Sequence, residues 1–185
     1  NWITKVTPPG LKTMLAKKDT PDDLWVKCPL SGELVYKTDL EENWHVTPAG
    51  AHLRISPRTR LRLLFDDERW EPLALPSVPH DPLKFKDDKP YPSRLKAAKA
   101  KIAARDKKES ENGGAPIIQE DCMVAAYGKI GGVPTVVLVQ DFAFMGGSLG
   151  MAAGEGFVAA AQMALARKAG FVVCTASGGA RMQEG

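Results

Sequence analysis

Apolar and turn-forming positions are most clearly ordered after residue 117. The run Met123-Val-Ala-Ala-Tyr-Gly-Lys-Ile predicts a strand, and Gly131-Gly132 predicts a tight turn. The following run, Pro134-Thr-Val-Val-Leu-Val-Gln-Asp-Phe, predicts the returning strand. Residues 123–142 are therefore expected to form a β-hairpin.

A helix and a third strand are expected after this hairpin. Small residues predominate from Leu149 to Ala169, where we expect a helix with Ser148 as N-cap and Gly170 at its end. The apolar run 171–176 predicts a strand, and the glycines after it predict a turn into another helix. The order strand, strand, helix, strand indicates an α/β fold.

The first 116 residues show three different patterns. Residues 1–25 are a polar, proline-bearing lead-in, and residues 26–56 have the pattern of a small β-rich module. Residues 57–116 are expected to form a helical and basic linker region, beginning with a helix that Ser56 caps. Residues 117–185 would then be the first part of the α/β domain.

Composition narrows the class of protein. Of the 185 residues, 44% are hydrophobic and 25% are charged, which is typical of a globular protein. A net charge of +3 does not favour nucleic acid as the main partner. No apolar stretch approaches the roughly 20 residues that span a bilayer, and the first residues lack the pattern of a signal peptide. Three widely spaced cysteines do not suggest a disulfide framework, so we expect a reducing, cytoplasmic setting.

Residues 84–108 are the most basic part of the chain, with ten Lys or Arg against three Asp. Leu95, Ala98 and Ile102 fall at helical spacing, so one face can pack while the lysines stay in water. A solvated surface helix is the simpler interpretation. The other interpretation is a cationic rim that attracts a phosphate-bearing ligand.

The glycines after the third strand are the best candidate for chemistry. The phosphate-binding motifs G-x-G-x-x-G and G-x-x-x-x-G-K-[ST] are absent. Ser177 is expected to cap a helix rather than act as a nucleophile, because G-x-S-x-G requires glycine where Thr175 stands. Gly178 and Gly179 can instead point backbone N–H groups into one space and hold an oxyanion, such as the enolate of a thioester. The alternative is a tight turn with no ligand.

A second candidate is a degenerate metal site in the β-rich module. Cys28-Pro-Leu-Ser31 has the spacing of half a zinc ribbon, and Thr47-Pro-Ala-Gly50 has the spacing of the other half. Structural zinc needs four Cys or His ligands. This module contains only Cys28, with His45 or His52, as possible ligands. We therefore expect no tight zinc binding.

Together these features resemble one family, the carboxyltransferase β subunits of bacterial acetyl-CoA carboxylase. Four pieces carry the resemblance in order along nearly the whole chain. They are the ribbon-like segment around Lys27-Cys28 and Ser31-Gly32, Asp81-Pro-Leu-Lys-Phe-Lys-Asp, Phe142-Ala-Phe-Met-Gly-Gly-Ser-Leu-Gly, and Ala176-Ser-Gly-Gly-Ala-Arg-Met-Gln-Glu. The last two are long and specific.

The resemblance implies a crotonase-like (ClpP/crotonase) superhelix of strand-strand-helix units. It also implies transfer of a carboxyl group from carboxybiotin, held on a carrier protein, to acetyl-CoA, which gives malonyl-CoA for fatty acid biosynthesis. The implied partners are the carboxyltransferase α subunit in an α2β2 assembly, the biotin carboxyl carrier protein and biotin carboxylase. Neither a membrane nor a nucleic acid is expected as a partner, and activity is expected only with the α subunit.

The resemblance also assigns roles to residues of this chain. No side-chain base is evident, which is consistent with a family in which biotin itself is thought to supply the base. The backbone oxyanion hole is assigned to Gly178, Gly179 and Ala180, and the substrate-binding surface to Gly146, Gly147, Ser148 and Arg181.

Two departures from the family remain. Most relatives have four ribbon cysteines where this chain has Cys28, Ser31, Thr47 and Gly50, so apolar packing of Trp44, Leu53 and Ile55 is expected to replace the metal. The family also continues beyond Gly185, so the piece alone is not expected to be active. A non-catalytic module that contacts RNA or protein, and a carboxyltransferase for another acyl-CoA such as propionyl-CoA, remain as alternatives.

Overall fold

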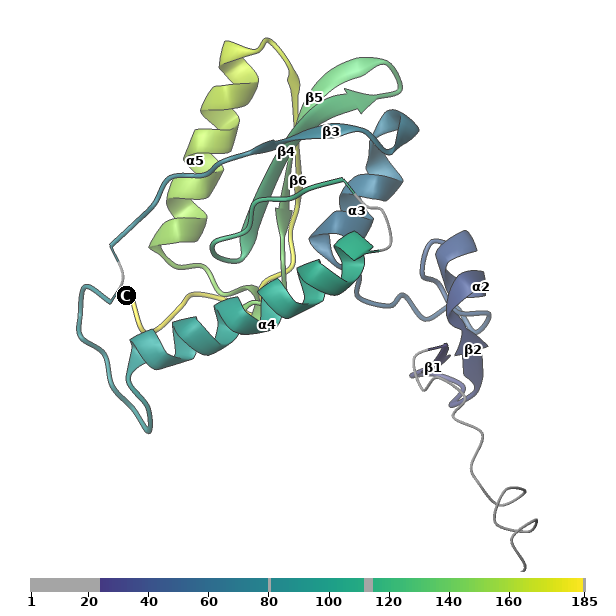
Figure 1. Ribbon diagram of the computed structural model, residues 1–185, viewed down its shortest axis with the longest axis horizontal. Coiled ribbons are helices and arrows are strands. Elements are labelled where there is room, and N and C mark those ends of the chain that lie inside the picture. Colours follow the sequence, from purple (N-terminus) through teal and green to yellow (C-terminus); the bar gives the residue numbers. More distant parts are fainter. Residues whose placement is uncertain (1–23, 80, 112–114, 185) are drawn as a thin grey trace, which may run out of the picture. The chain divides into compact units, whose positions relative to one another are not determined.

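The computed structural model describes residues 24–79, 81–111 and 115–184 (Figure 1). The chain divides into two compact units, residues 1–54 and residues 55–185. The predicted lead-in lies outside the described residues except at its end. Within the described ranges, no helix has the length and apolar character needed to cross a membrane.

The first unit contains a short hairpin and one short helix. β1 (Trp25–Lys27) pairs antiparallel with β2 (Leu34–Tyr36). α2 (Lys37–Glu42) follows β2 directly. A turn then brings Val46 and His52 together as an isolated antiparallel bridge. The unit is thus rich in β pairing, as the sequence pattern predicts.

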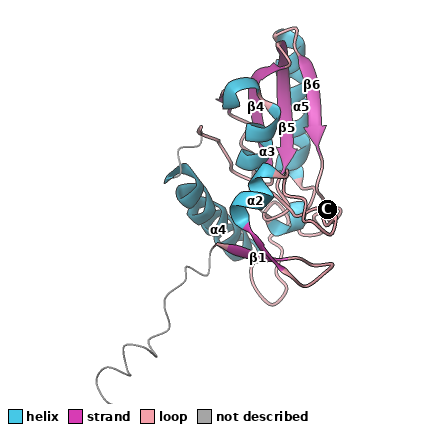
Figure 2. Cartoon of the chain, turned by 90° about the vertical axis from the view of Figure 1, so that its right-hand side faces the viewer, coloured by secondary structure: helices cyan, strands magenta, loops and turns pink. Residues whose placement is uncertain are grey.

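The second unit is built on a four-stranded sheet in the order β3-β4-β5-β6, and Figure 2 shows β4, β5 and β6 side by side. Its strands are β3 (Trp70–Leu73), β4 (Met123–Ile130), β5 (Val133–Gln140) and β6 (Gly170–Cys174). β4 pairs antiparallel with both β3 and β5, whereas β5 and β6 are parallel. β3 contains Pro72, which is tolerated because the strand lies at an edge of the sheet.

The predicted hairpin of β4 and β5 is confirmed. Gly131 and Gly132 form the turn with φ of 58° and 79°, the positive values that a type I′ turn requires at both central positions. The Asp66 carboxylate accepts hydrogen bonds from both glycine N–H groups at 2.8 Å. This distant carboxylate therefore holds the turn in place.

Two helices precede the hairpin along the chain. α3 (Pro57–Leu64) begins after the predicted cap, and the Ser56 hydroxyl accepts a hydrogen bond from Thr59 N at 3.1 Å. α4 (Tyr91–Glu111) is the predicted basic helix. Both helices contribute side chains to the core of the second unit, so residues 57–111 are not the linker that the sequence suggested.

Helices cover both faces of the sheet. On one face, α4 and α5 (Met151–Ala166) pack against strand residues that include Ala125 and Leu138. On the other face, α3 packs against their sequence neighbours, Val124 and Val137. Alternate strand residues point to opposite faces of the sheet. Since helices cover both faces, both sets of residues are apolar. This explains why the hairpin strands read as nearly continuous apolar runs.

The ends of α5 differ from the prediction. The helix starts two residues after the predicted start, its N-cap is Gly150, and Ser148 does not cap it. The Met151 N–H instead donates to the carboxylate of Glu184 at 2.6 Å, so the cap comes from a residue that is distant in the sequence. After β6, the described chain forms turns and a bridge up to Glu184, and the helix predicted there is absent from the described residues.

Candidate functional site

Two glycine-containing segments lie side by side at one edge of the sheet. We call residues 141–150, which follow β5, the β5 loop, and residues 175–181, which follow β6, the β6 turn. Because β5 and β6 are parallel neighbours, their carboxyl ends reach the same edge. Three backbone hydrogen bonds of 2.9 Å join the segments, namely Leu149 N to Gly179 O, Arg181 N to Leu149 O, and Gly178 N to Gly146 O. The structure thus brings together all seven residues predicted for the site.

Gly147 allows this close approach. Its φ is +62°, a left-handed conformation that favours glycine. A Cβ built on Gly147 would overlap the Ala176 carbonyl oxygen and lie 3.1 Å from its carbonyl carbon. At the neighbouring Gly146, with φ of +68°, a Cβ would meet nothing within 4 Å. Of the two glycines, therefore, Gly147 is the one that the packing of the two segments requires.

Gln140 is a site residue that the sequence analysis did not identify. It is the last residue of β5, it is 5% exposed, and its carboxamide touches both segments. Nε2 donates to Gly147 O at 2.7 Å, and Oε1 accepts from Ala176 N at 3.2 Å. The sequence signal for Gln140 is a polar residue directly after four apolar ones, Val136 to Val139, at the end of the strand.

The three predicted oxyanion donors differ in the structure. Gly178 N–H is already bonded to Gly146 O, so it is not an open donor as the sequence analysis expected. Gly179 N–H donates to the Ser177 hydroxyl at 3.0 Å, so Ser177 closes a local turn instead of capping a helix. Ala180 N–H has no acceptor among the described residues. The arrangement therefore offers one open backbone donor, at Ala180, and a second at Gly179 if the serine hydroxyl is displaced.

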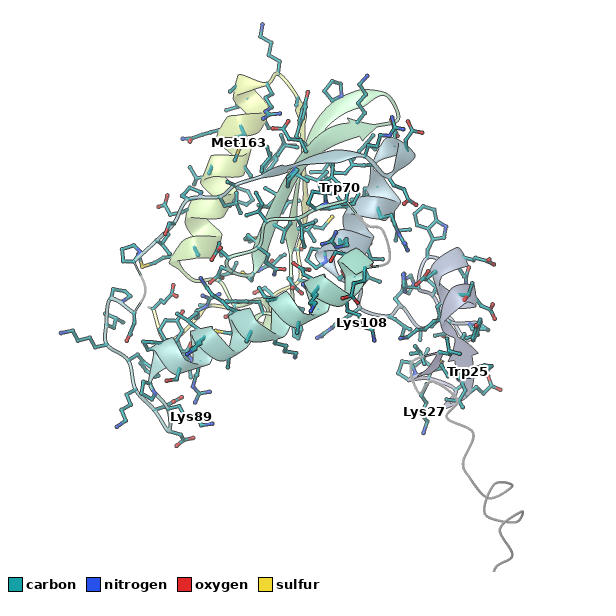
Figure 3. The ribbon with its side chains drawn as sticks, in the orientation of Figure 1. Trp25, Lys27, Trp70, Lys89, Lys108 and Met163 are labelled. Atoms are coloured by element: carbon teal, nitrogen blue, oxygen red, sulfur yellow. The ribbon has the colours of Figure 1, made fainter. Side chains whose placement is uncertain are left out.

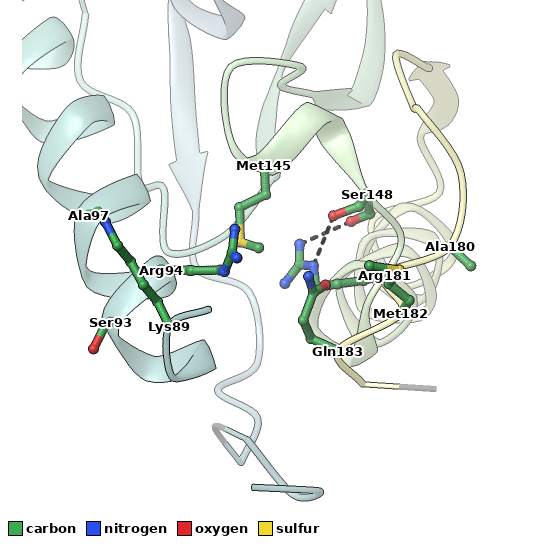
Figure 4. A pocket seen from close by; sticks show the side chains of 10 residues that line it. All are labelled: Lys89, Ser93, Arg94, Ala97, Met145, Ser148, Ala180, Arg181, Met182 and Gln183. Carbon is green, nitrogen blue, oxygen red and sulfur yellow. Dashed lines mark hydrogen bonds between the residues drawn. The ribbon is translucent and has the colours of Figure 1, made fainter. Parts of the chain in front are cut away.

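Arg181 is buried between the two segments and the rest of the unit. Its side chain is 0% exposed, and it forms a two-pronged ion pair with Asp121 at 2.6 and 2.8 Å. Nε donates to the Ser148 hydroxyl at 3.0 Å, and a terminal nitrogen donates to Ser148 O at 2.9 Å (Figure 4). The guanidinium was predicted to bind substrate, but its donors are used to hold the β5 loop.

Tyr91 and Glu184 complete this buried network. The Tyr91 hydroxyl donates to Glu184 and accepts from Arg181 at 3.2 Å. Burial, followed by the hydrogen bond to Glu184, raises the pKa of Tyr91 above its ordinary value, so the hydroxyl keeps its proton. Since Glu184 also caps α5, one network fixes the first turn of α4, the first turn of α5 and the β6 turn.

A pocket of about 580 Å³ opens beside Ala180 (Figure 4). Its lining comes from the start of α4, from the β5 loop and from the chain around the β6 turn. The lining residues are Lys89, Ser93, Arg94, Ala97, Met145, Ser148, Ala180, Arg181, Met182 and Gln183. Of the predicted substrate-binding residues, Ser148 and Arg181 therefore line the pocket, whereas Gly146 and Gly147 join the two segments.

Much of the charge on the basic helix is neutralised. Arg94 pairs with Asp87 at 2.6 Å, Lys99 with Glu120 at 2.8 Å, and Arg105 with Asp141 at 2.8 Å. Lys89, two residues before the start of α4, has no carboxylate partner in the part of the chain that the structure describes, and Lys108 lies toward the other end of the helix (Figure 3). Of the ten Lys and Arg in residues 84–108, Lys89 therefore lines the pocket without an ion-pair partner among the described residues.

The four ribbon positions of the first unit do come together, through hydrogen bonds. Cys28 Sγ and Thr47 Oγ1 are 3.2 Å apart, and Ser31 N donates to Cys28 Sγ at 3.4 Å. Gly50, with φ of +80°, donates to Thr47 O at 2.8 Å. Cys28 and Thr47 are 1% and 2% exposed. A sulfur–hydroxyl pair thus lies at these positions, and in the described residues no three Cys, His, Asp or Glu are placed to hold a metal.

The three apolar residues expected to replace the metal differ in burial. Trp44 is 65% exposed, Leu53 is half-buried, and Ile55 belongs to the other unit. Leu40 and Ala51 of the first unit are buried, at 2% and 6% exposed.

Comparison with known proteins shows what the chain is similar to. Residues 100–185 match the family described as carboxyl transferase domain. Over its whole length the chain is 82% identical to the acetyl-coenzyme A carboxylase carboxyl transferase subunit beta of Hyphomonas neptunium, of which it covers 57%. It is 57% identical to the protein of the same name from Hirschia baltica, of which it covers 49%. The chain thus spans about half the length of the curated relatives it matches.

Among solved structures, the chain is similar to transcarboxylase 12S, with 26% identity and a TM-score of 0.49, over 71% of this chain and 21% of that one. The curated relatives and the family match agree with the resemblance found in the sequence: over its whole length the chain is similar to acetyl-coenzyme A carboxylase carboxyl transferase β subunits, and residues 100–185 match the carboxyl transferase domain.

Proposed function

We propose that this chain is part of the carboxyltransferase β subunit of an acetyl-CoA carboxylase, in which a carboxyl group passes from carboxybiotin to acetyl-CoA to give malonyl-CoA. The proposal rests on one observation above all, the open Ala180 N–H beside a 580 Å³ pocket at the edge where the two glycine segments meet. The names of the relatives supply the substrate.

The proposed reaction requires no side chain to act as a base. The α-carbon of the thioester loses a proton and negative charge grows on the thioester oxygen, which a preorganised N–H stabilises. Carboxybiotin would supply the carboxyl group, released as CO2 when its N–C bond breaks, and the nitrogen that accepts the proton. The α-carbon would then form its new C–C bond with that CO2. In this chain, Ala180 would donate to the oxygen, Gly179 would join it if Ser177 turned away, and Lys89 would attract the phosphates of the CoA.

The wider assembly belongs to the same proposal. The sheet, with a β5–α5–β6 crossover, suits the first turn of a crotonase-like superhelix, and the hydrogen-bonded Cys28 and Thr47 suit a metal-free, ribbon-like module. The partners would be the α subunit in an α2β2 assembly, the biotin carboxyl carrier protein and biotin carboxylase, in the cytoplasm. The alternative of an RNA-binding module has less support, since three cations of the basic helix are paired.

The test is reverse carboxyl transfer from malonyl-CoA to a free biotin derivative, with the full-length parent of this chain and its α subunit. Gly179→Val should abolish turnover, because φ of +123° in the β6 turn excludes a branched side chain. Gly132→Val is the matched control, since it places the same side chain at φ of +79° in the hairpin turn. Equal turnover of the two variants would contradict the site.

The same assay addresses the acyl group. Methylmalonyl-CoA replaces malonyl-CoA in a parallel reaction, at equal concentration. A higher kcat/KM with methylmalonyl-CoA would move the proposal to a propionyl-CoA carboxyltransferase. Inactivity with both substrates, in the presence of a folded α subunit, would favour a non-catalytic module.

A further inference from the structure

The Gln140 carboxamide is a bridge between the β5 loop and the β6 turn. One end donates to a carbonyl of the β5 loop, at Gly147, and the other accepts from an N–H of the β6 turn, at Ala176. Only this orientation of the amide satisfies both backbone groups, because a carbonyl cannot donate and an N–H cannot accept. Gln140 therefore contacts the two halves of the site at once, by a donor and an acceptor in a single side chain.

The position of this bridge links it to the proposed oxyanion donor. Gly147 adjoins Gly146, whose carbonyl holds Gly178 N–H at 2.9 Å, and Ala176 begins the short stretch that leads to Ala180. We infer that Gln140 is a positioning residue for the proposed carboxyl transfer, on which this inference rests. It sets the separation of the β5 loop and the β6 turn, and so the direction of the Ala180 N–H, without touching substrate.

Packing alone does not account for a glutamine here. The preceding residues of the strand, Val136 to Val139, are apolar and at most 4% exposed. A buried amide is unfavourable unless both of its ends are hydrogen-bonded, whereas leucine or methionine would fill similar space without that requirement. The residue is explained by the two backbone groups that it joins.

Two variants and one control separate positioning from stability. Gln140→Met keeps the approximate volume and removes both hydrogen bonds. Gln140→Glu keeps an oxygen for Ala176 N–H but, when ionised, faces Gly147 O with a second acceptor. Protonation of the buried glutamic acid would restore the donor, and burial raises the pKa of such a group. Thr135→Val is the control, because it removes a part-buried hydrogen bond from the same strand, donated by the buried Thr135 Oγ1 to Val133 O, outside the site.

The full-length β subunit with its α subunit is assayed by reverse carboxyl transfer between pH 6 and pH 8.5. Gln140→Met should lower kcat about 10- to 100-fold, as expected for a displaced reacting geometry, with KM within about threefold of the wild-type value. The kcat of Gln140→Glu, divided by that of wild type at the same pH, should rise as the pH falls. Thr135→Val should keep the wild-type kcat even if its unfolding midpoint drops.

The outcomes are distinct. A Gln140→Met kcat equal to that of Thr135→Val, or a Gln140→Glu ratio that is constant over the pH range, overturns the inference. Hydrogen exchange of the peptide that contains Ala176 gives a readout without turnover, and it should quicken in Gln140→Met but not in Thr135→Val. If wild type itself is inactive, the proposed function fails, and unchanged exchange in Gln140→Met would separately refute the bridge.

Discussion

Gly147→Ala tests the packing of the two glycine segments directly. The added Cβ would overlap the Ala176 carbonyl, which belongs to backbone and cannot rotate away as a flexible side chain would. Gly146→Ala is a matched comparison, since φ is +68° there and +62° at Gly147, but its Cβ enters open space. Both variants carry the same left-handed strain and the same change in the unfolded chain. Their difference therefore isolates the contact between the segments.

The size of that difference follows from the hydrogen bonds that must break. The β6 turn would have to move by more than 1 Å to reach the 3.4 Å of ordinary van der Waals contact. Bonds of 2.7 Å (Gln140 to Gly147) and 2.9 Å (Gly178 to Gly146) do not survive that lengthening. Each bond contributes about 1 kcal/mol net. We expect Gly146→Ala to lower the free energy of unfolding by about 1 kcal/mol and Gly147→Ala by about 3 kcal/mol.

The assay is denaturant unfolding of the full-length β subunit, wild type and both variants, with hydrogen exchange to locate the change. Protection should fall in the peptides covering 144–150 and 175–181 of Gly147→Ala, and remain near wild type in Gly146→Ala. Equal free energies of unfolding for the two variants, within about 0.5 kcal/mol, would refute the close approach at Gly147.

Three further predictions concern other contacts. Arg181→Met should lower the free energy of unfolding by about 3 kcal/mol, because it leaves the Asp121 carboxylate, which is only 13% exposed, without its partner, and adding Asp121→Asn should recover part of that loss in denaturant unfolding. Glu184→Ala should cost about 1 kcal/mol and speed hydrogen exchange at Met151, since it removes the cap of α5; unchanged exchange would contradict that role. Hydrogen bonds from Ser31, then from Thr47, lower the pKa of Cys28 from 9.0 to about 7, so protection of residues 24–54 against exchange should rise from pH 7 to pH 9 and level off above. Cys28→Ala should remove that rise, and added zinc should not alter the protection of the wild type.

Sequence patterns predict the secondary structure of the second unit well because the relevant forces are local. The Gly131-Gly132 turn, the Ser56 cap and the apolar hairpin strands each depend on neighbours a few residues away. The placement of both glycine segments at one site also follows, since a helix between two strands makes them parallel neighbours with their ends at one edge.

The predictions that the structure corrects concern residues whose hydrogen-bond partners are distant in the sequence. Ser148 has the chemistry of a helix cap, but Arg181 takes its hydroxyl and Glu184 caps α5 instead. Gly178 has an N–H suited to an oxyanion, but the fold supplies Gly146 O as its acceptor. No local pattern reveals which acceptor a backbone N–H will meet, nor that Gln140 will reach two loops.

The Arg181 network has a consequence for the order of folding. Arg181 bonds to residues 33, 60 and 90 positions earlier, at Ser148, Asp121 and Tyr91. Contacts of such long range form late, because the entropy of closing each loop is lost before the contact stabilises the chain. During synthesis from the N-terminus, the hairpin and α4 can assemble before the arginine has been made. The candidate site is therefore expected to be the last part of the described unit to become ordered, after the hairpin and α4 have packed together.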